Sequence, residues 1–189
     1  MDMKEKFIRD FPVPKGDKKE PYIIVFDAYC GQGKSYTSKI ISQYDHSIIL
    51  INDQVRYWLN NYTEDVSDIL HELQYHRLEL LLQNHNSCIW DSCAGHNWDK
   101  KRARLEQIGY PYYVIRLQCR EETVRERMKN RKVDNNINFS IGTFDDYLWC
   151  VEHVPPIADE LISYTIDTEQ DVDSQAKQFL KKYHLMPKK

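Results

Sequence analysis

The stretch from Tyr22 to Lys39 limits the possible folds of this chain more than any other segment. Its first part, Tyr22 to Phe26, is an apolar run and predicts a short buried strand. A glycine-bearing turn from Ala28 to Gly33 follows, and Lys34-Ser35 then opens a predicted helix. A strand, a glycine-rich turn, Lys-Ser and a helix in this order form the phosphate-binding P-loop.

The chemistry of this loop explains its residue types. Backbone N–H groups surround an anion, and the helix N-terminus adds partial positive charge. Gly31 and Gly33 allow the backbone to approach a phosphate closely. Lys34 is expected to reach the β- and γ-phosphates, and the Ser35 hydroxyl to ligate Mg²⁺. We therefore predict that a nucleoside triphosphate contacts Ala28, Tyr29, Cys30, Gly31, Gln32, Gly33, Lys34, Ser35 and Tyr36.

One position departs from the strict P-loop pattern. Ala28 stands where glycine is commoner, although alanine is a small replacement. The alternative interpretation is an ordinary glycine-rich turn that is followed by Lys-Ser by chance. The strand before the turn and the helix after it favour the P-loop.

Composition places the chain among ordinary globular proteins. Its 189 residues suffice for one domain, and the net charge of −3 gives no global basic field for nucleic acid. No segment has the length of a membrane span, and the first eleven residues are too charged for a signal peptide. The five cysteines are odd in number and lie mostly in apolar runs, which suits free thiols in a reducing cytoplasm.

The pattern of the chain predicts alternating strands and helices. Residues 1–20 are expected to form an N-terminal arm that packs through Phe7, Ile8 and Phe11, and residues 21–189 one domain. Further strands are predicted at 47–51, 87–91, 112–117 and 162–166. Helices are predicted at 34–43, from 54, and at 64–84, 98–107, 120–132, 143–151 and 171–183, with a loop at 134–138.

This alternation predicts an α/β fold of three layers, with a five-stranded, mainly parallel sheet between helices. Ligands of such folds bind at the carboxyl ends of the strands. The P-loop, Asn52-Asp53, Asp91 and Asp167-Thr168 all follow predicted strands directly. We expect these residues to meet at one edge of the sheet.

Together these motifs resemble the small P-loop kinases related to polynucleotide 5′-kinase and the zeta-toxin kinases. Besides the P-loop, the resemblance rests on Asp53-Gln54-Val55-Arg56, Asp91, Arg127 and Arg131, Val151-Glu152-His153-Val154-Pro155 and Ile166-Asp167-Thr168. It covers most of the chain from Tyr22 onward. It implies the P-loop NTPase fold with a helical lid around residues 120–140, and ATP and Mg²⁺ as cofactors.

The resemblance implies that Asp53 accepts the proton of the substrate hydroxyl and that Arg56 binds the substrate. The position agrees, because a base near the γ-phosphate must lie at the carboxyl end of a neighbouring strand. The alternative, which does not exclude the catalytic role, is that Asp53 caps a helix that begins at Gln54; the position favours the catalytic role.

Asp91 ends a predicted strand and has two possible roles. Its carboxylate suits the binding of Mg²⁺ through water or of the substrate. Aspartate is also common in turns that follow strands.

Arg127 and Arg131 lie four residues apart on the predicted lid helix. The resemblance implies a lid that folds over ATP, in which both arginines stabilise the charge of the transferred phosphoryl group. Arg127, Asp167 and Thr168 are also expected to bind the nucleotide. The alternative is a solvated helix face, because glutamates interleave with these arginines.

A second basic cluster, Lys100, Lys101, Arg102 and Arg104, follows Asp91 on the next helix. It could contact a phosphorylated or nucleic-acid acceptor, but its pattern favours a solvated helix face. Two apparent zinc motifs are set aside. His71 and His76 are five residues apart and point in different directions on a helix, while Cys88, Cys93 and His96 lack a fourth ligand.

The sequence therefore predicts an enzyme that transfers the γ-phosphate of ATP to a hydroxyl group. A nucleic-acid 5′-hydroxyl, a nucleotide-sugar, another metabolite and an antibiotic all remain possible acceptors. The alternative is a nucleotide-binding NTPase or switch module that acts through a protein partner. Such a module would turn over without an acceptor. The oligomeric state does not follow from the sequence.

Overall fold

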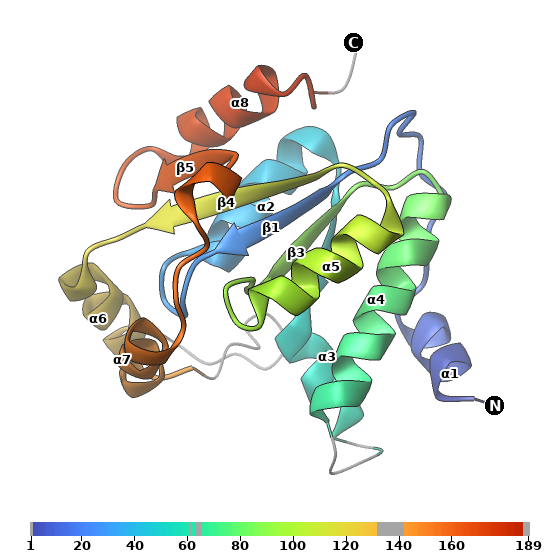
Figure 1. Ribbon diagram of the computed structural model, residues 1–189, viewed down its shortest axis with the longest axis horizontal. Coiled ribbons are helices and arrows are strands. Elements are labelled where there is room, and N and C mark those ends of the chain that lie inside the picture. Colours follow the sequence, from blue (N-terminus) through green and yellow to red (C-terminus); the bar gives the residue numbers. More distant parts are fainter. Residues whose placement is uncertain (1, 61, 63–65, 132–141, 187–189) are drawn as a thin grey trace.

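The strands that the structure describes form one parallel sheet. The structure, a computed structural model, describes residues 2–60, 62, 66–131 and 142–186. The strands are β1 (Ile23–Asp27), β2 (Ile48–Ile51), β3 (Cys88–Cys93), β4 (Tyr112–Gln118) and β5 (Tyr164–Asp167). They lie in the order β2-β3-β1-β4-β5, and each neighbouring pair runs parallel (Figure 1). The sheet predicted as mainly parallel is thus entirely parallel.

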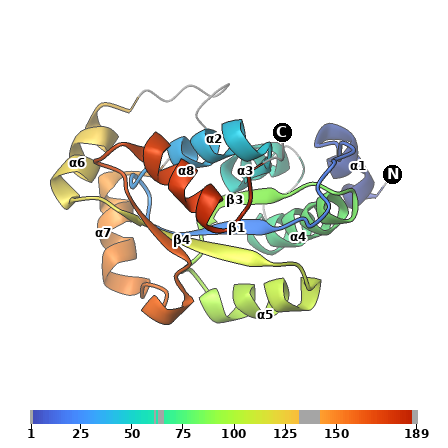
Figure 2. The ribbon, with the colours of Figure 1, turned by 90° about the horizontal axis from the view of Figure 1, so that it is seen from above.

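Helices cover both faces of this sheet, as predicted. Within the described residues they are α1 (Met3–Asp10), α2 (Lys34–Asp45), α3 (Asn52–Leu59), α4 (Ser67–Gln83), α5 (Trp98–Ile108), α6 (Glu121–Lys129), α7 (Phe144–His153) and α8 (Val172–Lys182), with a 3₁₀ turn at Asp159–Leu161. Helices α2 and α8 pack on one face, and α4 and α5 on the other (Figure 2). The result is a three-layer α/β/α fold.

Strand β1 shows why its sequence is an uninterrupted apolar run. Ile24 and Phe26 pack with residues of α2 and α8, while Ile23 and Val25 pack with residues of α4 and α5. All four side chains are at most 3% exposed. A central strand of a parallel sheet is covered on both faces, so alternation between apolar and polar residues is lost.

The first twenty residues differ from the predicted arm. They contain helix α1, which Asp2 and Glu5 cap reciprocally. Phe7 and Phe11 are buried and Ile8 is partly buried, against α3 and α4, so the predicted packing is confirmed. The helix was missed because its apolar residues are few and its charges alternate.

The other element boundaries shift by a few residues. Helix α3 begins at Asn52 rather than Gln54, and α6 ends at Lys129 rather than near residue 132. The capping box of Thr143 and Asp146 at the start of α7 is confirmed. The loop predicted at 134–138 lies outside the described residues.

Two further predictions concern the chain as a whole. All five cysteines are free thiols. Among the described residues, no helix combines the length and the apolar character that crossing a membrane requires.

A buried ion pair joins β1 and β4 beneath the P-loop. The Asp27 carboxylate, 6% exposed, accepts a hydrogen bond from Arg116 Nε at 2.6 Å and another from the Ile157 amide at 3.2 Å. Arg116 also contacts Asp159 and the Ile157 carbonyl. Three segments that are distant in sequence are thereby held together at the end of β1.

We expect Arg116→Met to lower the free energy of unfolding by about 2–3 kcal/mol, because it leaves the buried Asp27 carboxylate without its cation. The expected loss of unfolding free energy is smaller than that for a fully buried ion pair, since 21% of the Arg116 side chain is exposed. Urea denaturation followed by circular dichroism measures the change. Arg102→Met, which removes an exposed pair with Glu106, is the control and should cost well below 1 kcal/mol. Equal losses in both variants would contradict the assigned role of Asp27.

Candidate functional site

The P-loop forms a turn whose backbone conformation requires glycine at two positions. Gly31 has a φ of 80° and Gly33 a φ of 98°, both in the left-handed region. The Gln32 side chain accepts a hydrogen bond from the Tyr29 amide at 2.6 Å, and Lys34 Nζ donates to the Tyr29 carbonyl at 2.7 Å. The ammonium group of Lys34 is therefore held against the loop that the sequence predicts to bind phosphates.

Neighbouring elements pack tightly on the two glycines. A Cβ atom on Gly31 would lie 2.7 Å from Val124 Cγ1 and 2.9 Å from Met128 Cε, both on α6. A Cβ on Gly33 would lie 3.3 Å from Thr168 Cγ2 and 3.6 Å from Arg127 Nη1. The predicted lid helix and the loop after β5 thus contact the P-loop directly.

The Asp91 carboxylate lies beside the P-loop helix. Strand pairing between β1 and β3 shifts register here, from Val25 opposite Trp90 to Phe26 opposite Cys93, so β3 bulges at Asp91 and Ser92. Burial raises the pKa of Asp91, whereas the charge of Lys34 and a hydrogen bond with the Ser35 hydroxyl oppose this increase. Asp91 is therefore next to both P-loop residues for which we predicted phosphate and metal contacts.

The Ser35 hydroxyl and the Asp91 carboxylate are chemically suited to Mg²⁺. This cation commonly takes one or two protein oxygens and completes its shell with water and substrate phosphates. No group of three or more histidine, cysteine, aspartate or glutamate side chains that could hold a metal occurs within the described ranges, which leave out 132–141 among others. A site of one hydroxyl and one carboxylate next to a phosphate loop thus fits Mg²⁺ better than zinc.

Asp53 lies in the first turn of α3, directly after β2. Ile51, two residues before Asp53, pairs with Asp91 across β2 and β3. The charge of Asp53 contributes to the raised pKa of Asp91. Asp53 Oδ1 accepts a hydrogen bond from Arg56 Nη1 at 2.5 Å. The helix cap is Ile51, without a side-chain cap bond, so the capping role proposed for Asp53 is wrong. Helix α3 starts too early for that role.

Asn52, which the sequence predicts only to lie at this edge of the sheet, holds the start of α3 in place. Its Oδ1 accepts hydrogen bonds from Trp90 Nε1 at 2.8 Å and from Gln74 Nε2 at 3.2 Å. These bonds join β3 and α4 to the residue before Asp53. Asparagine is common in turns that follow strands, so the sequence alone does not show that Asn52 joins these elements. Its hydrogen bonds with Trp90 and Gln74, which are distant in sequence, show it.

Arg127 on α6 reaches the loop after β5. Its guanidinium donates to Thr168 Oγ1 at 3.0 Å, to the Thr168 carbonyl at 2.6 Å and to Cys119 Sγ at 3.4 Å. Arg127 is thus not part of a solvated charge row, unlike Arg125, which pairs with Glu121 on the same helix. Arg127 and Thr168 were both predicted to bind nucleotide, and the structure brings them together near Gly33.

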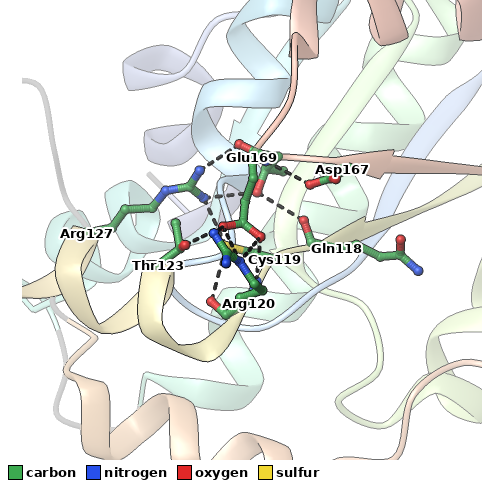
Figure 3. A network of polar contacts seen from close by, with 8 residues as sticks. Gln118, Cys119, Arg120, Thr123, Arg127, Asp167 and Glu169 are labelled. Carbon is green, nitrogen blue, oxygen red and sulfur yellow. Dashed lines mark hydrogen bonds and ion pairs between the residues drawn. The ribbon is translucent and has the colours of Figure 1, made fainter.

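A second set of contacts fastens α6 to the same loop (Figure 3). Glu169 accepts hydrogen bonds from the Arg120 guanidinium at 3.0 Å and from the Thr123 hydroxyl. These bonds lower the pKa of Glu169 to about 2. The Asp167 carboxylate accepts a hydrogen bond from the Glu169 amide at 2.9 Å, so Asp167 helps to shape this loop. Whether it contacts nucleotide remains a prediction.

Arg131 reaches the first half of the P-loop through Gly142. Its Nη1 donates to the Gly142 carbonyl at 3.2 Å, and Gly142 lies against Cys30. Most of the predicted lid beyond Arg131 falls at 132–141, outside the described residues. The structure thus places Arg131 beside the P-loop, while the closure of a lid stays a prediction.

The basic cluster on α5 divides into two groups. Arg102 pairs with Glu106, Arg104 pairs with Glu79, and Lys100 is exposed. Lys101 is the exception, because it is partly buried and its Nζ donates to the Cys93 carbonyl at 2.6 Å. Only Lys101 in this cluster is directed to the carboxyl end of β3.

Comparison with known proteins gives structural matches and no sequence matches. No protein-family model and no curated protein matches the chain. A provisionally assigned kinase from Chloroflexus aurantiacus superposes with a TM-score of 0.66 at 16% identity, over 86% of this chain and 98% of that one. For a gluconokinase from Sinorhizobium meliloti the TM-score is 0.58 at 13% identity, over 86% and 90%. For the APS kinase of Mycobacterium tuberculosis it is 0.55 at 12%, over 87% and 98%.

These neighbours are kinases of the P-loop type, and none of the three is a polynucleotide 5′-kinase or a zeta toxin. The narrower resemblance therefore stays a prediction. At 12–16% identity, the similarity establishes the architecture. The chain has the parallel α/β fold of P-loop kinases.

Proposed function

We propose that the protein is a kinase that transfers the γ-phosphate of ATP to a hydroxyl group and uses Mg²⁺. The observation that carries the proposal is the convergence of Lys34, Asp91 and Asp53 on one sheet edge, from the ends of three neighbouring strands. A lysine suited to phosphate, a carboxylate suited to a metal and a second carboxylate, that of Asp53 paired with Arg56, match the parts that phosphoryl transfer needs.

The roles follow from these positions. The loop amides and Lys34 bind the phosphates of ATP. Ser35 and Asp91 hold Mg²⁺, which neutralises phosphate charge when bound. Asp53 accepts the proton of the acceptor hydroxyl while the acceptor oxygen bonds to the γ-phosphorus and the bond to the departing ADP breaks. Arg56, paired with Asp53, orients the acceptor, and Arg127 and Arg131 stabilise charge on the transferred group.

The structural neighbours support a hydroxyl acceptor of small size. One is named a gluconokinase and another an APS kinase that was solved with AMPPNP and APS. The net charge of −3 also disfavours long nucleic acid. The resemblance to polynucleotide 5′-kinases nevertheless keeps a 5′-hydroxyl among the acceptors to be tested.

Incubation with γ-labelled ATP and Mg²⁺, with and without acceptors, tests the proposal. The panel contains nucleosides, 5′-hydroxyl oligonucleotides, sugars, sugar acids, nucleotide-sugars and aminoglycosides. We expect label on at least one acceptor and at least tenfold less phosphate release from ATP alone. Rapid release without any acceptor would reject the kinase and favour an NTPase or switch module.

A further inference from the structure

Lys101 is a partly buried lysine without an acidic partner. Its Nζ donates to the Cys93 carbonyl at 2.6 Å, and no ion pair within the described part of the chain includes it. Burial lowers the pKa of Lys101 to about 8. By contrast, Lys177 on α8 pairs with Asp173 at 2.7 Å. A cation withdrawn from water without a carboxylate is unfavourable unless something else compensates it.

Other basic groups surround this lysine. His71 on α4 is half-buried, and its pKa is lowered by burial and by the positive charges of Lys101, Arg56 and His96, against the opposing charge of Asp68. Helices α3, α4 and α5 thus each direct a basic group to the same region. Of these groups, Arg56 already pairs with Asp53, and the lowered pKa of His71 keeps its ring neutral near neutral pH. Lys101 is thus the partly desolvated cation for which the described residues offer no carboxylate, and an anion would compensate its charge.

Lys101 lies on a different side of the P-loop region from the residues predicted to bind the nucleotide. Strand β1 leads into the P-loop, and Arg127 and Thr168 lie on the β4–β5 side. Lys101 contacts the Cys93 carbonyl at the end of β3, two residues after Asp91. Its charge and that of Arg56, on α3 directly after β2, both act on His71 of α4, which links Lys101 to the side of Asp53. Figure 1 shows that α5 begins at the carboxyl end of the sheet. A group bound by Lys101 would therefore belong to the acceptor.

We propose that the acceptor carries an anionic group, a phosphate, sulfate or carboxylate, in addition to its reacting hydroxyl, and that Lys101 binds this anion with His71 and His96 beside it. The proposal rests on the proposed kinase function and narrows its acceptor class. The proposal also gives a function to one member of the basic cluster on α5, because Lys101 alone of this cluster is directed to the site. Lysine serves here as a point charge, which suits any of the three anions.

Matched acceptors test the proposal in the enzyme. Each pair shares its hydroxyl and differs in the anion, such as a nucleoside against its 3′-phosphate and glucose against gluconate. We expect the anionic member to have the lower KM. Lys101→Met should raise that KM at least tenfold, with the KM for ATP unchanged. Lys100→Met, the exposed neighbour on the same helix, is the control and should change neither.

The pH dependence gives a second readout, since Lys101 is charged only below its pKa of about 8. The KM for the anionic acceptor should rise as the pH passes through 8, and this rise should be absent in Lys101→Met. The titratable and charged groups around Lys101 and His71 are Cys93, His96, Arg56 with its partner Asp53, and Asp68. His71→Gln and His96→Gln are therefore compared over the same range. A rise unchanged by Lys101→Met would overturn the assignment.

A binding measurement separates this inference from the proposed function. With a non-hydrolysable ATP analogue occupying the P-loop, inorganic sulfate, phosphate and acetate are titrated while the Lys101 ammonium signal is followed by NMR. We expect a saturable shift and a higher pKa of Lys101, lost in Lys101→Met and kept in Lys100→Met. No shift with any of the three anions would overturn the anion site even if kinase activity were found. Failure to bind the ATP analogue would instead reject the proposed function.

Discussion

We expect Asp53→Asn to lower kcat by about 10²–10⁴-fold, because an amide cannot take the proton of the acceptor hydroxyl. Asp53 lies at the end of β2, one strand away from Asp91, and 2.5 Å from the Arg56 guanidinium. The hydrogen bond that its carboxylate makes goes to Arg56 and not to a P-loop residue, so the affinity for ATP should stay within about twofold of the wild type. Transfer of label from γ-labelled ATP gives kcat, and calorimetry with an ATP analogue gives the affinity.

Two variants make this result specific to Asp53. Asp99→Asn removes an exposed acid from the first turn of α5, close in sequence to the same sheet edge, and should leave kcat unchanged. Arg56→Gln removes the partner of Asp53 and should raise the KM for the acceptor more than it lowers kcat. If Asp53→Asn retained full kcat, another group would have to be the base and the mechanism proposed above would be wrong.

The parts of the site that the sequence could predict are those formed by local structure. The P-loop depends on consecutive residues, and its strand, turn and helix lie where the pattern places them. Asp53 and Asp91 were predicted because a parallel sheet brings the ends of its strands to one edge. Their closeness needs only the neighbouring positions of β2 and β3, which the strand order provides.

The roles that the sequence does not reveal depend on contacts between distant segments. Asn52 is fixed by Trp90 and Gln74, and Glu169 by Arg120 and Thr123. Lys101 looks like its neighbours in sequence, yet it alone is turned toward the end of β3. Helical spacing gives the direction of such a side chain only roughly, and what it meets depends on the packing of the helix.

The same reasoning explains the helix that the sequence did not predict. Helix α1 has one fully buried residue, Phe7, and few other apolar positions to give a periodic signal. Its side chains pack against Trp58 on α3, with ring centroids of Phe7 and Trp58 5.4 Å apart. Short helices are stabilised mainly by such tertiary packing, which is invisible in the local pattern.

We expect Lys34→Met to lower kcat/KM for ATP by about 10²–10³-fold, equivalent to about 3–4 kcal/mol. Lys34 Nζ is 2.7 Å from the Tyr29 carbonyl, at the mouth of the turn formed by Gly31 and Gly33. From this place it can exchange the carbonyl for phosphate oxygens, whose negative charge it then compensates. Methionine keeps the aliphatic chain and removes only the charge, so the fold should be preserved.

Measurements of ATP affinity and of stability distinguish this effect from unfolding. Lys39→Met, one turn further along α2 and exposed, is the control and should retain kcat/KM within about twofold. Urea denaturation should give the same midpoint for both variants.

The charge of Lys34 lowers the pKa of Asp91, so the loss of this charge in Lys34→Met should raise the pKa of Asp91 further. Metal binding should then weaken as the pH falls, over a range higher than in the wild type. Unchanged ATP affinity in Lys34→Met would mean that the loop does not bind phosphate, and the proposed function would fail at its first step.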